Sequence, residues 1–224
     1  PRDQGAIERQ SALVAPEPPA LGDAPAGVRE RGRLMQEAVA PGAGAMAAVM
    51  GLDGAEVARL CEEAAATDVL APANLNGASQ VVVAGHAQAV ERLLVLVAAR
   101  RGRAQRLAVS APFHCALMAP AAVGLARVLE GLRFREPAIP VWTSVEARPV
   151  NGAAELRELL VRQVTAPVRW EDTVLGLAAA GAGLALETGP GTALSGLLRR
   201  SVPGLEAIPA GDIAGIARAK ERLP

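Results

Sequence analysis

Short apolar runs alternate with amphipathic segments along the chain from Gly44 onward, and this alternation constrains the fold more than any other feature. In the amphipathic segments apolar residues recur three and four positions apart, which is the period of a helix, whereas the short runs have the length of strands. Beyond Pro112 the strand-like runs and the helix-like segments simply alternate. This order predicts an α/β fold with a mostly parallel sheet whose faces are covered by helices. The expected strands there are residues 139–145, 184–187 and 205–208, and the expected helices carry apolar stripes from Leu125, Leu156 and Trp170 onward.

Residues 44–110 have a different order of elements, β-α-β-β-α-β, which is the order of a ferredoxin-like subdomain. We therefore expect residues 1–43 and 111–224 to form one large, discontinuous α/β domain into which this subdomain is inserted. Several prolines interrupt residues 15–27, so the sequence indicates no firm structure there. Within the subdomain we expect strands at 45–50, 69–75, 80–84 and 106–109, with Asn76-Gly77 as the turn between the second and the third. We expect helices with the buried stripes Val57, Leu60, Cys61, Ala64 and Val90, Leu93, Leu94, Val97.

The charge balance and the scarcity of aromatic residues exclude several classes of function. The 23 basic residues equal the 23 acidic ones, so no overall field attracts nucleic acid or an anionic membrane. Aromatic residues make up 2% of the chain, which leaves few surfaces on which bases could stack. No apolar run has the length of a bilayer span, and the first residues lack the order of a signal peptide. We expect a cytoplasmic protein without nucleic-acid or membrane partners.

His114 is one of two histidines, and it lies just after Pro112, which ends a predicted strand. Loops at strand ends are where α/β folds place catalytic residues, whereas a structural or surface histidine is the alternative on pattern alone. Cys115 is its neighbour, but adjacent side chains of an extended segment point to opposite sides, so we expect a packed thiol rather than a Cys–His pair. His86 begins a helix after a strand, where a structural role is expected. Neither Cys61 nor Cys115 has the spacing of a metal site or redox pair.

Gln163 and a run of arginines are further polar candidates. Gln163 occupies the last position of an apolar helical stripe, so its amide or its backbone should face inward and find a partner, unless it is an ordinary helix-end residue. Arg29, Arg31 and Arg33 could form a solvated helix face, or one of them could offer the planar two-pronged donor that suits a carboxylate. The sequence Gly189-Pro190-Gly191 indicates a tight β-α turn and is too short for a phosphate loop.

Over about residues 28–201 the chain resembles the malonyl-CoA:acyl-carrier-protein transacylases and the acyltransferase domains of polyketide synthases. The resemblance implies an α/β-hydrolase-like acyltransferase core that lacks its early strands, and hence an amino-terminally incomplete member. The segments that carry it begin at Arg31 (RGRLMQEAV), Gly44 (GAMAAVMGL), Gln80 (QVVVAGH), Ser110 (SAPFHCALM), Leu160 (LVRQ), Pro167 (PVRW) and Glu187 (ETGPG).

In that family a serine attacks malonyl-CoA with a histidine as its general base, and the malonyl group passes through a seryl ester to the thiol of acyl carrier protein. The resemblance implies that His114 is the base and that the main-chain carbonyl of Gln163 orients it. It assigns the substrate carboxylate to Arg31, and it makes Phe113 the bulky residue that disfavours an α-methyl branch. It implies malonyl-CoA and acyl carrier protein as the substrate and partner of a monomer that has no metal and no bound cofactor.

The nucleophilic serine is not found at its expected position. Residues 11–15 (SALVA) resemble the stretch just after the family's nucleophile, and counting back places Ala6 where the serine belongs. Ser11 lies five residues further on, more than a helical turn away, so it is not a substitute. Three explanations stay open: an incomplete or altered record of an active enzyme, an inactive homologue that binds carrier protein or CoA without turnover, and a fragment completed by another chain.

Overall fold

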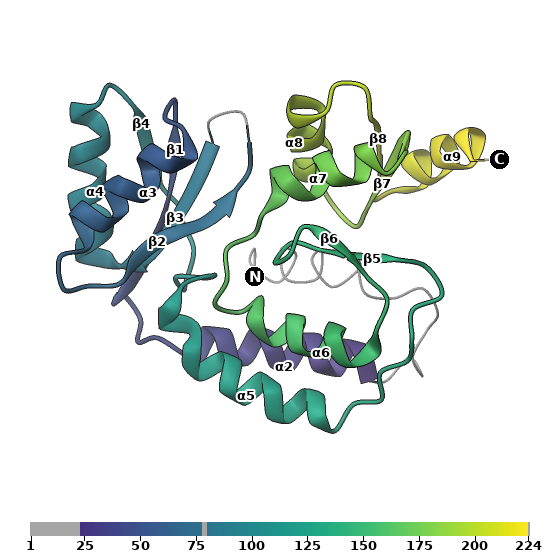
Figure 1. Cartoon of the computed structure of the whole chain (residues 1–224), viewed down its shortest axis with the longest axis horizontal. Coiled ribbons are helices and arrows are strands. Elements are labelled where there is room, and N and C mark those ends of the chain that lie inside the picture. Colours follow the sequence, from purple (N-terminus) through teal and green to yellow (C-terminus); the bar gives the residue numbers. More distant parts are fainter. Residues whose placement is uncertain (1–22, 78–79, 224) are drawn as a thin grey trace.

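The computed structural model describes residues 23–77 and 80–223. Figure 1 shows a sheet with helices on the left, a group of helices along the bottom, and further strands and helices toward the centre and right. The order along the chain is α2 (Asp23–Glu37), β1 (Gly44–Met50), α3 (Gly54–Ala65), β2 (Leu70–Leu75), β3 (Gln80–His86), α4 (Ala87–Ala99), β4 (Arg103–Arg106), the 3-10 helix η2 (Ala116–Met118), α5 (Ala119–Glu130), β5 (Val141–Thr143), β6 (Arg148–Val150), α6 (Ala153–Arg162), α7 (Trp170–Ala179), β7 (Leu184–Thr188), α8 (Ala193–Ser201), β8 (Glu206–Ala210) and α9 (Ile213–Arg222).

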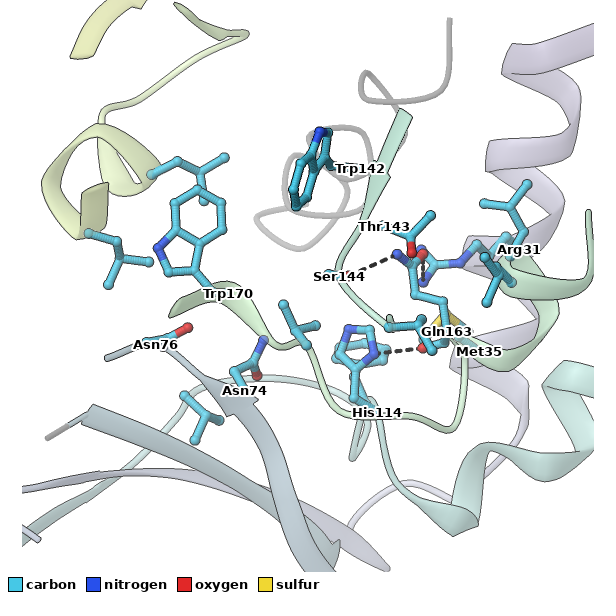
Figure 2. Close-up of a pocket in the computed structure, with 18 of the residues that line it drawn as sticks. Arg31, Met35, Asn74, Asn76, His114, Trp142, Thr143, Ser144, Gln163 and Trp170 are labelled. Carbon is cyan, nitrogen blue, oxygen red and sulfur yellow. Dashed lines mark hydrogen bonds between the residues drawn. The ribbon is translucent and has the colours of Figure 1, made fainter. Parts of the chain in front are cut away.

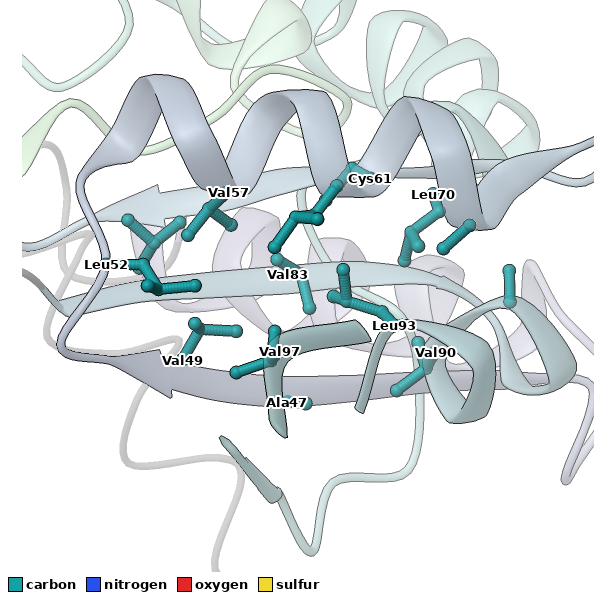
Figure 3. Close-up of a cluster of buried hydrophobic side chains, with 14 of the residues drawn as sticks. Ala47, Val49, Leu52, Val57, Cys61, Leu70, Val83, Val90, Leu93 and Val97 are labelled. Atoms are coloured by element: carbon teal, nitrogen blue, oxygen red, sulfur yellow. The ribbon is translucent and has the colours of Figure 1, made fainter. Parts of the chain in front are cut away.

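Strands β1 to β4 form an antiparallel sheet in the order β2-β3-β1-β4. Alternate residues of β1 face opposite sides, so Ala47 and Val49 join the cluster under α3 and α4, whereas Met46 and Ala48 join a second cluster on the other face. Figure 3 shows the first cluster between the sheet and its helices, with Cys61 buried within it. Buried apolar residues therefore lie on both faces of the four-stranded sheet. The face opposite α3 and α4 can also form one side of a site.

The element order of residues 44–110 agrees with the order expected from the sequence, but the last strand does not lie where the sequence predicts it. It spans Arg103–Arg106 rather than 106–109 and pairs only with β1, at the edge of the sheet. Polar side chains suit an exposed edge, whereas Leu107 and Val109 pack onto the second face of the sheet after the strand has ended.

Helices α2, α5 and α6 form a separate layer, in which α5 contacts both of the others (Figure 1). Met35, Met118, Leu125 and Val164 are buried between them. Helix α2 begins at Asp23, inside the 15–27 segment for which the sequence indicates no firm structure. Pro25 lies in the first turn of α2, where its missing N–H removes no intrahelical hydrogen bond, so this proline does not interrupt the helix.

The prediction of an α/β fold is confirmed, but the prediction of a mostly parallel sheet is wrong for the residues that the structure describes. Strand β7 pairs with β8 in parallel, because α8 between them provides the crossover. The expected strand 139–145 is instead β5, which pairs antiparallel with β6. Only residues 144–147 separate these two strands, too few for a parallel crossover. In the described ranges, every helix is too short or too polar to span a bilayer.

Candidate active site

A cavity of about 500 Å³ lies where the four-stranded sheet, the helical layer and the C-terminal elements meet. Figure 2 shows side chains from these three regions converging on it. Most of its wall is aliphatic, and a few polar groups interrupt the apolar surface, as is usual for a ligand site. The polar and aromatic residues among its lining are Arg31, Asn74, Asn76, Phe113, His114, Trp142, Thr143, Ser144, Gln163 and Trp170.

His114 lies in the loop between β4 and η2, and its side chain is buried. Its Nδ1 atom is 2.8 Å from the main-chain oxygen of Gln163. A carbonyl oxygen only accepts hydrogen bonds, so Nδ1 must carry the proton and the lone pair must be on Nε2. The backbone of His114 has φ 60°, in the left-handed region that costs a non-glycine residue about 1–2 kcal/mol. Such backbone strain is common where a fold holds a functional side chain in place.

The pKa of His114 is lowered to about 4, chiefly by burial and secondly by the positive charge of Arg31. The carbonyl of Gln163 opposes this shift, since it stabilises the protonated ring. The imidazole is therefore neutral at pH 7, with Nε2 able to accept a proton.

Arg31 enters the site from α2 and is 5% exposed. Its Nη2 atom donates a long hydrogen bond of 3.4 Å to Oε1 of Gln163, whereas its Nε atom has no partner among the described residues. No carboxylate of the described residues forms an ion pair with it. Burial lowers the pKa of Arg31 to about 10, so the guanidinium remains a cation at pH 7. A buried cation of this kind is a strong site for an anion.

Gln163 links the imidazole and the guanidinium. It caps the C-terminus of α6, and its side-chain amide lies between Arg31 and Ser144, with Nε2 3.2 Å from Oγ of Ser144. The guanidinium only donates, so the amide oxygen must face Arg31 and the amide nitrogen must face Ser144. The segment after Gln163 is fixed against β2, because the N–H of Leu75 donates to the oxygen of Val168 at 2.8 Å. The inward polar partner expected for Gln163 is thus observed for both its backbone and its amide.

Of the other residues that the sequence singles out, Phe113 lies at the cavity, whereas Cys115, His86 and Arg33 have structural or surface positions. Phe113 lines the cavity beside His114 and packs against the helical layer and the sheet. Cys115 is buried, donates from Sγ to the oxygen of Pro112, and has its pKa raised to about 11 by burial, so it is a packed thiol. Nδ1 of His86 accepts the N–H of Val69, a structural role. Arg33 is exposed and pairs with glutamates of α2.

Sequence reasoning does not select Asn74, Asn76 or Trp170 as site residues, and it marks Trp142 only as a departure from the family pattern near the pocket. The pattern marks Asn76 only as part of a turn and Trp170 only as part of a helical stripe. Both tryptophans of the chain line this cavity, and the scarcity of large aromatic residues in the sequence is a signal that could have indicated it. No group of three or more His, Cys, Asp or Glu side chains that could hold a metal ion occurs in the part of the chain that the structure describes.

One wall of the cavity is formed by the first turns of α8, through Ala193, Leu194 and Leu197. The buried carboxylate of Glu187 fixes this wall, since it accepts the N–H groups of Leu194 at 3.0 Å and Ser195 at 2.8 Å. An acidic group at a helix N-terminus is favoured by the free N–H groups and the helix dipole. Glu187, which lies just before the Gly189-Pro190-Gly191 turn, therefore caps the helix.

The family model of the acyl transferase domain matches residues 11–221 of this chain. The malonyl CoA-acyl carrier protein transacylase of Escherichia coli K12 is 44% identical over 212 residues, which cover 94% of this chain and 69% of that protein. The chain belongs to the malonyl CoA-acyl carrier protein transacylase family.

Other members of the transacylase family agree with this assignment. The Bacillus subtilis transacylase is 38% identical, with 95% of this chain and 68% of that protein covered. The structure of the transacylase from Xanthomonas oryzae matches with a TM-score of 0.90 at 42% identity, over 96% of this chain and 68% of that one. A malonyl-transacylase in complex with the acyl carrier protein of a type II polyketide synthase matches with a TM-score of 0.91 at 44% identity, over 96% and 70% of the two chains.

These transacylases give no support to the alternative hypothesis of a chain that binds without turnover. Ala6, which the sequence places at the nucleophile position, lies outside the described residues, as does Ser11. The structure therefore brings His114, the main-chain carbonyl of Gln163 and the buried cation of Arg31 together at one cavity.

Proposed function

We propose that this chain transfers a malonyl group from malonyl-CoA to the phosphopantetheine thiol of acyl carrier protein. The observation that carries the proposal is that Arg31 and His114 line one cavity, although 83 residues of sequence separate them, and that both contact Gln163. Family membership supports the same reaction. The complex of a similar transacylase with its carrier protein supports acyl carrier protein as the partner.

Arg31 is proposed to receive the free carboxylate of the malonyl group. Its buried guanidinium has an Nε donor without a partner and only one long hydrogen bond among the described residues. A carboxylate could occupy two of the free donors in the parallel arrangement that arginine favours. An acetyl group has no second carboxylate and would leave this buried charge uncompensated, so malonyl should be preferred.

His114 is proposed to act as the general base of a two-step exchange. Its Nε2 takes the proton of a serine hydroxyl while that oxygen attacks the thioester carbonyl. The carbon–sulfur bond then breaks, and the imidazolium returns its proton to the departing CoA thiolate, which leaves malonyl as a seryl ester. In the second step the carrier thiol gives its proton to Nε2 and attacks the ester, and the serine oxygen leaves with that proton.

Phe113 is proposed to disfavour branched acyl groups. It directly precedes His114 in the sequence and lines the same cavity, where it is held between the helical layer and the sheet. A ring packed on both sides has little freedom to move away from an α-methyl group. Methylmalonyl-CoA should therefore be a poorer substrate than malonyl-CoA.

The proposal is tested by incubating the chain with radiolabelled malonyl-CoA and isolating the acyl-enzyme. Two chains are compared: the sequence as it stands, and the variant Gln4→Gly/Gly5→His/Ala6→Ser/Glu8→Gly, which restores the family's serine elbow. We expect the elbow variant to carry the radiolabel, and we expect no label on protein when His114→Ala is combined with the elbow changes. Absence of both labelled protein and malonyl-CoA binding in the elbow variant would reject the proposed function.

We further propose a monomer that acts in the cytoplasm, without a metal, a bound cofactor or a nucleic-acid partner. The two buried, unpaired cysteines are compatible with a reducing compartment. For residues 44–110 we propose an inserted ferredoxin-like subdomain, supported by the β1-α3-β2-β3-α4-β4 order and the antiparallel sheet order.

A further inference from the structure

The cavity extends well beyond the groups that would hold a malonyl unit. Figure 2 shows Arg31 and Gln163 on one side, His114 below, and Trp170 and Asn76 on the opposite side, with Trp142 above the space between them. If the carboxylate lies at Arg31 and the thioester lies at His114, the sulfur substituent must leave on the side away from Arg31. That direction leads between Trp142 and the residues around Trp170.

Trp142 occupies its place because residue 176 is a glycine. A Cβ atom added at Gly176 would lie 2.5 Å from Cζ3 and 3.0 Å from Cη2 of the Trp142 indole. Gly176 lies within α7 (Trp170–Ala179), so its backbone is helical and no positive φ requires a glycine there. Glycine inside a helix is less favourable than alanine. The feature that explains the glycine is therefore the close approach of the indole to the bare helix backbone.

We propose that Trp142 and Gly176 together set the width of the channel that receives the pantetheine arm shared by CoA and acyl carrier protein. The inference rests on the proposed function, and it adds a determinant that acts on the thiol-bearing side of the substrate rather than on the acyl group. Pantetheine carries methylene and dimethyl groups, which gain free energy by contact with a flat apolar indole. Gly176 does not touch the substrate; it positions the indole.

The smallest informative change is Gly176→Ala. The added methyl group overlaps the far edge of the indole, a side chain with two rotatable bonds, so the indole rather than α7 should move. Movement away from α7 widens the gap between the indole and Trp170, which begins the same helix, and removes the indole's contact with the pantetheine arm, whereas the helix itself gains a better helix former. We expect affinity for CoA and for pantetheine to fall by about tenfold without a lower thermal stability.

Trp142→Phe tests whether Gly176→Ala acts through the indole or through a general effect on α7. Phenylalanine has no atoms at the positions of Cζ3 and Cη2, so Gly176→Ala should have little effect in the Trp142→Phe background, and the two changes should be non-additive. Gly196→Ala is the matched control, because it makes the same change inside α8, where the nearest atom to the added Cβ is 3.8 Å away on the flexible Arg200 side chain. This control should leave affinity unchanged.

The proposal is tested by calorimetric titration. The unaltered chain is compared with Gly176→Ala, Trp142→Phe, their combination and Gly196→Ala. The ligands are CoA, pantetheine and the holo and apo forms of acyl carrier protein. We expect Gly176→Ala to weaken CoA, pantetheine and holo carrier protein, and to leave apo carrier protein unaffected. Equal affinities for Gly176→Ala and the unaltered chain, or the same loss in the Trp142→Phe background, would overturn it. A loss for CoA but not for pantetheine would also overturn it, since the indole would then contact the nucleotide. If the unaltered chain binds none of these ligands, the proposed function fails with it.

Discussion

Nδ1 of His114 lies 2.8 Å from the main-chain oxygen of Gln163, and the side chain of the same glutamine contacts Arg31. One residue thus contacts the imidazole through its backbone and the guanidinium through its amide. These two tasks can be separated by mutation, because a substitution removes the amide and keeps the carbonyl. The geometry also explains why the last polar position of an otherwise apolar helical stripe faces the cavity.

Gln163→Ala should therefore weaken malonyl-CoA binding by about three- to tenfold, the loss expected for one ordinary hydrogen bond because the contact with Arg31 is long, without altering the tautomer of His114. Calorimetry measures the affinity, and ¹⁵N NMR of the imidazoles measures the tautomer. With only two histidines in the chain, His86→Gln assigns the signals. Thr165→Ala, a change at a half-buried position two residues further on, should alter neither quantity. A shift of the His114 proton from Nδ1 to Nε2 in Gln163→Ala would contradict this account.

The buried His114 should make the folded state less stable in acid. Its pKa is about 4 in the folded chain, whereas the ordinary pKa of a histidine side chain is 6.5. Below pH 6.5 the unfolded chain therefore binds a proton that the folded chain does not, and stability falls by about 1.4 kcal/mol per pH unit until about pH 4. Urea unfolding at pH 7 and pH 5 measures this change.

The control for this prediction is His114→Gln, which cannot be protonated in this range. The loss of stability between pH 7 and pH 5 should be smaller in this variant than in the unaltered chain by about 2 kcal/mol. An identical loss in both chains would show that His114 titrates normally in the folded state.

Glu187 should contribute strongly to stability although it does not line the cavity. Glu187→Ala leaves two N–H groups of α8 without their charged acceptor and should cost about 2–4 kcal/mol of unfolding free energy. Glu187→Gln keeps one acceptor and should cost less. Glu206→Ala on the neighbouring strand breaks an exposed ion pair with Arg222 and should cost much less than Glu187→Ala. Equal costs for Glu187→Ala and Glu206→Ala in urea unfolding would contradict the capping role.

Local pattern is sufficient for much of the fold. The stripes of Val57 and Leu93 identify the helices over the antiparallel sheet, and the turn at Gly77 identifies the hairpin of β2 and β3. Strand direction is not accessible in the same way. Residues 139–145 have the composition of a buried strand, but their antiparallel pairing depends on the short connection to β6, which the sequence pattern does not reveal.

The site is predictable where a family motif marks it and not elsewhere. His114, Gln163 and the arginine run stand out by pattern, and a resemblance assigns their roles and adds Phe113. The structure brings His114, Gln163, Arg31 and Phe113 to one cavity. Trp142 is not selected, because nothing in its own sequence neighbourhood indicates that it lies against a glycine 34 residues later. Contacts of this kind arise from tertiary packing, which no local periodicity encodes.

The central claim is that the buried Arg31 is held for the carboxylate of the acyl group that His114 acts on. The direct test is the ratio of malonyl-CoA to acetyl-CoA affinity, measured by calorimetry for the unaltered chain and for Arg31→Ala, with the exposed Arg33→Ala as the matched control. The unaltered chain and Arg33→Ala should prefer malonyl-CoA by about tenfold or more, and Arg31→Ala should lose that preference by weakening malonyl-CoA alone. Equal losses for the two thioesters in Arg31→Ala would contradict the claim.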